Sequence, residues 1–458
     1  MATAKTAACC RLFIVRYYAT PLPSISHAFM SDKGFVRAIG RFDLTAAIVN
    51  GVIGSAIFGM PARIAELTGV WSPLAYLAAG LGVMSMVLCF AEVASRFQDP
   101  GGPYLYCREA FGPWVGFEAG WLTFWIRVTS VAANINVLVD YLAQTLPAAG
   151  TPAGRAATMT LVLGVITIIN VIGVRQATWT IDVLTVAKLL PLLLLIALGT
   201  LRLSPEVLAS QAVVSPDWTS AILLLLYAYG GFEAPLIPAG ETKNPKHDSA
   251  FALIVAMAII ASIYMLVQLA VVGVVPHAAA AKAPIAAAFE RLIGPSGRAF
   301  ASFAVVLSVS AWATGSVLQS PRVLYSIAER HELPALFARV HERFRTPHVA
   351  IVTYSALALA LALYGSFEWN ATLSAIVRLV TYGLTCVAVP VLRRRAGFPE
   401  PGFRLPLAAA IAVVPAGVGF ALWLLLTRPF AQVWILPALM GVGALLYAAK
   451  RGRTIAGA

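Results

Sequence analysis

Two short stretches of this sequence place helix-breaking residues in apolar surroundings, where their backbone groups could bind a small ligand. The first reads NGVIGSAIFGMP from Asn50 to Pro61, and the second reads YAYGGFEAP from Tyr227 to Pro235. Glycine and proline weaken a helix, and in lipid a broken helix is tolerated only where it lines a cavity or is buried in protein. The 177 residues from Gly54 to Gly231 put one break in each half of the chain. That spacing indicates a solute site between two repeats.

The first stretch is expected to offer hydrogen-bond donors. The first N–H groups of a helical segment have no partner within the helix, and its N-terminus is electropositive, so it suits a carboxylate. The Ser55 hydroxyl adds a donor. The alternative is that small residues here only allow close helix packing. The candidate substrate-binding residues are Ile53, Gly54, Ser55, Ala56, Ile57 and Gly59.

The second stretch is expected to offer acceptors, because carbonyls freed at a helix C-terminus form an electronegative end that suits an ammonium group. Tyr227 and Phe232 flank the predicted break, and for both the alternative is ordinary packing. Glu233 follows directly and is expected either to cap the next half-helix or to bind protons. The candidate substrate-binding residues are Tyr227, Ala228, Gly230, Gly231 and Phe232.

Lys188 is the strongest single candidate for a functional ionisable residue, because it interrupts the apolar run TVAKLLPLLL. An ionisable group inside a membrane span is costly and is functional by default. Burial disfavours the charged form, so such a lysine could gain and lose a proton during transport. The alternative is a lysine that extends to the membrane surface. Arg127 and Arg378 also require partners, and Glu233 is one candidate for Arg127.

Trp312 and Ser316 are four residues apart in another predicted span, so they share a helix face. That face could border the ligand. Alternatively, the Ser316 hydroxyl bonds the backbone of its own helix.

Composition shows which elements must position these residues. Of 458 residues, 60% are hydrophobic and 12% are charged, with a mean hydropathy of +0.82. A soluble domain carries about 25% charged residues, so the sequence predicts an all-α polytopic membrane protein. The predicted spans are long enough to cross about 30 Å of hydrocarbon. They are 43–66, 72–95, 113–146, 155–173, 177–201, 218–240, 249–275, 298–327, 347–366, 370–391, 405–427 and 431–449.

The net charge of +13 follows this topology. Of 33 lysines and arginines, 23 lie on the side of both termini, 6 on the opposite side and 4 within or at the edges of spans. The positive-inside rule then predicts cytoplasmic termini in a cell membrane, or the inner membrane of a Gram-negative cell. The charge is therefore not evidence of nucleic-acid binding. None of the five cysteines lies in a predicted outer loop, so no external disulfides are expected.

Four motifs resemble those of the amino acid–polyamine–organocation permeases. They are GSAIFG, AEVASRFQDPGGPYLYCREAFGP, GGFEAPLIPAGETKNPKHD and RVLYSIAERHELPALFARVHERFRTP, within roughly 42–395. The resemblance implies twelve helices in a five-plus-five inverted repeat with a discontinuous first and sixth helix. The implied segments are a disordered tail 1–41, repeats 42–201 and 202–395, accessory helices 396–449 and a tail 450–458.

The resemblance also implies roles for single residues. Tyr227 takes the position of an aromatic gate over the ligand, and Glu233 matches an acidic residue after the break. Lys188 takes the place of a sodium ion in sodium-coupled relatives. The family usually has glycine at Ala56, so the added methyl group narrows the pocket and favours a small or medium neutral amino acid.

These features predict a secondary active transporter of amino acids that works by alternating access in lipid. Proton symport is the first mechanism and amino acid or polyamine exchange the second. A nutrient sensor that does not transport comes last, since it would need a soluble signalling domain. An enzyme is not expected, because no metalloprotease-type HExxH motif and no paired intramembrane aspartates occur, and the six histidines lie in tails and loops. No cofactor or metal is expected. Residues 147–155 hold no cysteine for a disulfide-linked heavy subunit.

Overall fold

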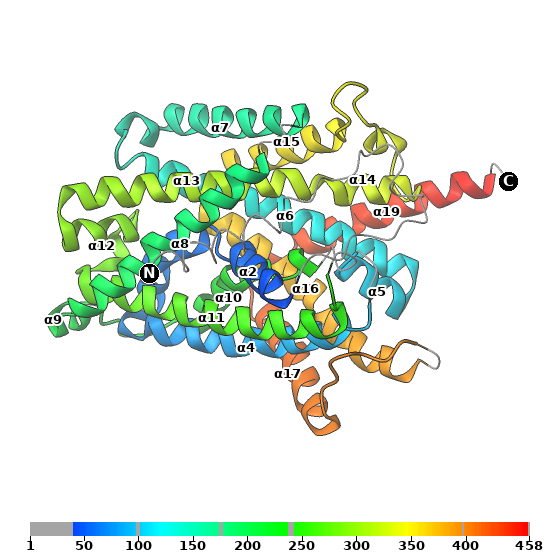
Figure 1. Cartoon of the computed structure of the whole chain (residues 1–458), viewed down its shortest axis with the longest axis horizontal. Coiled ribbons are helices and arrows are strands. Elements are labelled where there is room, and N and C mark those ends of the chain that lie inside the picture. The colour runs from blue at the N-terminus through cyan, green and yellow to red at the C-terminus, as the bar shows by residue number, and fades with distance from the viewer. Residues whose placement is uncertain (1–39, 98–100, 174–176, 237–241, 396–397, 457–458) are drawn as a thin grey trace, which may run out of the picture.

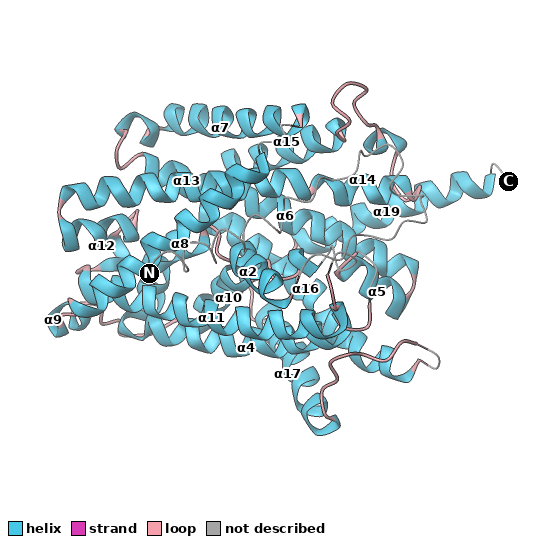
Figure 2. Ribbon diagram, in the orientation of Figure 1, coloured by secondary structure: helices cyan, strands magenta, loops and turns pink. Residues whose placement is uncertain are grey.

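The chain is described here from a computed structural model that covers residues 40–97, 101–173, 177–236, 242–395 and 398–456. Within these ranges the regular elements are all helices, with no strand (Figure 2). Nine helical stretches there are long and apolar enough to cross a membrane, and the apolar helices Lys188–Leu201 and His348–Tyr364 are shorter. The prediction of an all-α, multi-pass membrane protein is therefore confirmed. The predicted N-terminal tail lies almost wholly outside the described residues.

The helices alternate with short connections over the whole described chain. They are α2 (Arg41–Val52), α3 (Ala56–Thr68), α4 (Ser72–Ala94), α5 (Pro103–Phe111), α6 (Pro113–Leu142), α7 (Pro152–Ile172), α8 (Ala177–Leu201), α9 (Pro205–Ala209), α10 (Trp218–Tyr229), α11 (Pro245–Val274), α12 (Pro284–Ile293), α13 (Pro295–Gln319), α14 (Pro321–Glu329), α15 (His348–Tyr364), α16 (Phe367–Arg394), α17 (Leu407–Leu426), α18 (Phe430–Val433) and α19 (Ile435–Ala456).

The long helices run roughly along one axis of the molecule (Figure 1). Helices α4 and α11 lie side by side along one edge, and α7 and α15 lie along the opposite edge. The short helices α2 and α10 sit between these edges, together with α16. The two broken segments are therefore held at the centre of the bundle.

Two predicted spans end earlier than expected. The span 298–327 stops at Gln319, and a separate helix α14 begins at Pro321. Proline lacks an N–H group, so it suits the first turn of a new helix but cannot extend the old one. The span 113–146 stops as an α-helix at Leu142.

The first break is narrower than predicted. Helix α2 ends at Val52 and α3 begins at Ala56, so the break comprises only Ile53 to Ser55. Gly59 lies inside α3, where a Cβ atom would approach the side chains of Phe367 and Val137 to 2.7 and 2.8 Å. At Gly59, therefore, close helix packing accounts for the small residue.

The second break begins later than predicted, because α10 continues through Ala228 to Tyr229, whereas Tyr227 was expected to flank the break. A short 3-10 helix η3 (Ala234–Leu236) follows. Gly231 has φ +113°, which side chains other than glycine rarely adopt. A Cβ atom on Gly231 would also lie 3.0 Å from the carbonyl oxygen of Gly51. The two breaks thus pack backbone against backbone, and glycine is needed for that contact.

Candidate functional site

A small buried cavity lies between the two breaks. Its volume is about 10 Å³, which is roughly the room needed by one water molecule. An amino acid would fit only if the walls moved apart. The lining residues are Gly51, Val52, Gly54, Ser55, Ala56, Arg127, Ser130, Asn134, Tyr227, Gly230, Gly231, Trp312 and Arg378.

About half of the residues predicted to bind substrate reach this cavity. Those that line it are Gly54, Ser55, Ala56, Tyr227, Gly230, Gly231 and Trp312. Those that do not are Ile53, Ile57, Gly59, Ala228, Phe232 and Ser316. Apart from Trp312 of α13, the predicted residues that line the cavity belong to the two breaks and the helix ends beside them.

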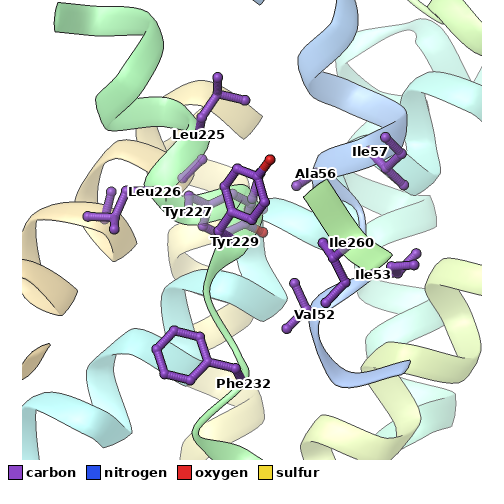
Figure 3. Packing of buried hydrophobic residues seen from close by; sticks show 14 of the residues in the cluster. Val52, Ile53, Ala56, Ile57, Leu225, Leu226, Tyr227, Tyr229, Phe232 and Ile260 are labelled. Atoms are coloured by element: carbon purple, nitrogen blue, oxygen red, sulfur yellow. The ribbon is translucent and has the colours of Figure 1, made fainter. Parts of the chain in front are cut away.

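Phe232 and Ser316 have other surroundings. The Phe232 ring projects away from Val52 and Ile53 (Figure 3), and it packs 5.1 Å from Phe90 between ring centroids. The Ser316 hydroxyl lies 2.9 Å from the hydroxyl of Tyr354. Both side chains therefore serve the packing of helices around the cavity and do not line it.

Side chains from helices distant in sequence bond the N–H and hydroxyl groups of the first break. The Ser55 N–H donates to Asn134 Oδ1 at 3.1 Å, and the Ser55 and Tyr227 hydroxyls lie 3.3 Å apart. The N–H groups of Phe58 and Gly59 bond the Ser55 carbonyl. In the described part of the chain this leaves the N–H of Ala56 at the start of α3, on the cavity wall, without a partner.

Lys188 lies on the acceptor side of the first break. Its side chain is 3% exposed, and Nζ donates to the carbonyls of Asn50 at 2.7 Å and Ile53 at 2.8 Å. The ammonium group therefore turns towards the break. The alternative of a lysine extended to the membrane surface does not agree with this geometry.

Two aromatic side chains bond the same end of α2. Trp312 donates from Nε1 to the Gly51 carbonyl at 3.2 Å. The Tyr264 hydroxyl lies 3.2 Å from the carbonyls of both Val52 and Ala228, so it links the first break to the second. Unpaired carbonyls at helix ends need such donors.

Glu233 organises the second break and is the partner of Arg127. Arg127 Nη2 donates to Oε1 at 2.9 Å, while the Tyr382 hydroxyl and the Gly231 N–H donate to Oε2 at 2.6 and 3.0 Å. Glu233 is 1% exposed. The carboxylate therefore bonds the backbone before it, and the expectation that it caps the following half-helix is not supported by these contacts.

Arg378 also reaches the cavity, although sequence reasoning placed neither arginine in the site. Its Nη2 donates to Ser130 Oγ at 3.2 Å, and its Cζ lies 5.8 Å from the centre of the Tyr227 ring. A Cβ atom on Gly230 would lie 1.3 Å from Arg378 Nη1, so only glycine fits beside the guanidinium. In the sequence, the indication for both arginines was that a charged residue within a membrane span requires a partner.

Broken helices packed around a buried polar cavity, within a multi-pass membrane protein, are the architecture of a secondary transporter. The profile of the amino acid permease family matches residues 39–446. The chain belongs to this family.

Similar proteins carry transport names. The serine/threonine exchanger SteT of Bacillus subtilis is 26% identical over 385 residues, which cover 82% of this chain and 88% of the relative. The methylthioribose transporter of the same bacterium is 25% identical and covers 93% and 96%. Its branched-chain amino acid permease BcaP is 25% identical and covers 90% and 94%. The family resemblance seen in the sequence is thus confirmed over most of the chain.

Proposed function

We propose that this protein is a proton-coupled amino acid symporter that works by alternating access, with its substrate site at the cavity between the two breaks. The N–H of Ala56 would meet the substrate carboxylate, with the Ser55 hydroxyl beside it. Tyr227, which is 5% exposed, would close over the ligand. The cavity must widen for binding, as expected of a site that alternates between open and closed forms.

We further propose twelve transmembrane helices in two inverted repeats, 42–201 and 202–395, with accessory helices in 396–449. The break after α2 and the break after α10 would then be equivalent positions. Both termini would lie in the cytoplasm and the protein in the cell membrane, as the distribution of basic residues predicts.

The contact of Lys188 with the first break carries the proton-coupling proposal. A protonated lysine donates to the Asn50 and Ile53 carbonyls, which a helix interruption leaves without helical partners. A neutral amine has fewer hydrogens to donate and no charge, so it would hold these carbonyls less firmly. Loss of the proton would therefore free the first break to change shape.

Uptake into proteoliposomes tests this proposal. Wild-type protein should take up labelled amino acids in response to an inward proton gradient. The Lys188→Met variant should lose that response while it still exchanges external for internal amino acid. The exposed Lys282 offers a matched control, and Lys282→Met should behave as the wild type. A Lys188→Met variant that still follows the gradient would overturn the coupling role.

Exchange is the second candidate, because the relative at 26% identity is named a serine/threonine exchanger. In that case wild-type uptake would require amino acid inside the vesicle and would ignore the pH gradient. The same vesicles loaded with and without amino acid separate the two mechanisms.

A further inference from the structure

The cavity wall carries more positive than negative charge. Arg127 and Arg378 line it, and Glu233 is the one carboxylate that the described residues place against Arg127. At the second break, therefore, two guanidinium groups share one carboxylate, and one positive charge is in excess. Lys188 lies on the far side of the first break, where backbone carbonyls bond it.

The two arginines differ in how well they are bonded. Arg127 has the ion pair with Glu233. Arg378 is 2% exposed, and its Nε and Nη1 have no hydrogen-bond partner in the part of the chain that the structure describes. A buried charge without such partners is strongly unfavourable. Its position on the cavity wall suggests that a bound anion supplies the missing acceptors.

Arg378 also occupies the position at the second break where the sequence predicted the ammonium group of the substrate. Its Nη1 lies against Gly230, which directly follows the last residue of α10. A helix C-terminus favours a positive charge. In this protein its own guanidinium fills that position, so the second break has less need of an ammonium group and more need of an anion.

We propose that Arg378 is a specificity residue that selects amino acids with a carboxylate side chain. A guanidinium can bind a carboxylate through two parallel hydrogen bonds, and Nε and Nη1 have hydrogens available for them. An acidic amino acid carries one net negative charge and would balance the excess positive charge at the second break. A neutral amino acid would leave that charge in place, and a cationic one would add to it.

This inference rests on the proposed amino acid transport and names its substrate class. It replaces the expectation of a neutral substrate, which rested on Ala56. The extra methyl group at Ala56 limits the room near the substrate backbone, whereas Arg378 determines which charge is accepted at the other end.

Uptake by purified wild-type protein in proteoliposomes tests the inference directly. Labelled L-glutamate, L-aspartate, L-serine, L-leucine and L-lysine are offered singly. Uptake of the two acidic amino acids should exceed that of the others at least tenfold. Wild-type preference for a neutral or a cationic amino acid would overturn the inference and leave the proposed function standing. If wild-type protein takes up none of them in gradient-driven or exchange assays, both fail.

Variants then locate the selectivity. Arg378→Gln removes the charge and should lower glutamate uptake at least tenfold relative to leucine uptake, and Arg378→Lys should restore part of it. The control is Arg202→Gln, because Arg202 is exposed just after α8 and lies in neither break. Equal loss for all substrates in Arg378→Gln, with an unchanged melting temperature, would contradict a role in specificity. If the variant does not fold, the wild-type preference decides.

Discussion

Both helix breaks leave backbone groups without helical partners, and different chemistry bonds the two breaks. At the first break, Lys188, Trp312 and Tyr264 donate to carbonyls, and Asn134 accepts from an N–H group. At the second break, the carboxylate of Glu233 bonds Arg127, Tyr382 and the Gly231 N–H. At the first break, side chains of other helices bond backbone groups, and Lys188 bonds only carbonyls there. At the second break, a carboxylate forms an ion pair with an arginine.

This difference assigns different sensitivities to the two breaks. Hydrogen bonds to backbone groups are modest singly, and losing one leaves the others in place. A buried ion pair behaves otherwise, because removal of one partner leaves the other charge without compensation. The second break should therefore be the more fragile of the two.

The largest effect is expected for Glu233→Gln. It leaves Arg127 and Arg378 buried without a countercharge, which should cost about 3–5 kcal/mol of the free energy of unfolding. Unfolding by sodium dodecyl sulfate in mixed micelles measures it. The exposed Glu206 gives the control, and Glu206→Gln should change stability by less than about 0.5 kcal/mol. A loss of similar size in both variants would show that the second break does not depend on charge.

A smaller loss is expected for Gly230→Ala. The added Cβ would overlap Arg378 Nη1, so the guanidinium must leave its place, at a cost typical of overpacking, about 1–3 kcal/mol. The same unfolding assay applies. Among the described residues nothing lies within 4 Å of a Cβ atom on Gly164 in α7, so Gly164→Ala should not destabilise the protein. If the Gly230→Ala variant is stable and its substrate preference is unchanged, the position of Arg378 does not depend on a glycine at residue 230.

The first break should respond more weakly to Trp312→Phe. This change removes the Nε1 donor to the Gly51 carbonyl, and one such hydrogen bond contributes about 0.5–1.5 kcal/mol. Its effect on stability should therefore stay below that of Glu233→Gln. The reverse order would contradict the contrast between the breaks.

The smallest effect is expected for Ser316→Ala. The Ser316 hydroxyl bonds Tyr354 and does not line the cavity. KM for uptake should remain within about twofold of the wild type, since loss of a hydrogen bond outside the site leaves substrate contacts intact. A tenfold rise in KM would place Ser316 in the open form of the site.

The sequence predicted the membrane class, both breaks and the burial of Lys188, because glycine, proline and charge are conspicuous in apolar spans. It did not predict that Phe232 and Ser316 turn away from the cavity, since side-chain direction depends on helix rotation. The sequence also did not predict the contact of Arg378 with Gly230. These residues lie 148 positions apart in the chain, and only tertiary packing brings them together.

The hydroxyl of Tyr264 has one hydrogen and two acceptors, the carbonyls of Val52 and Ala228. At any instant it can satisfy only one of them fully, so the two halves of the site compete for a single proton donor. Tyr264 belongs to α11, so neither half of a broken helix carries it. If the site opens as proposed, one carbonyl would keep the tyrosine and the other would turn to water, so opening and hydration of the site would be a single event.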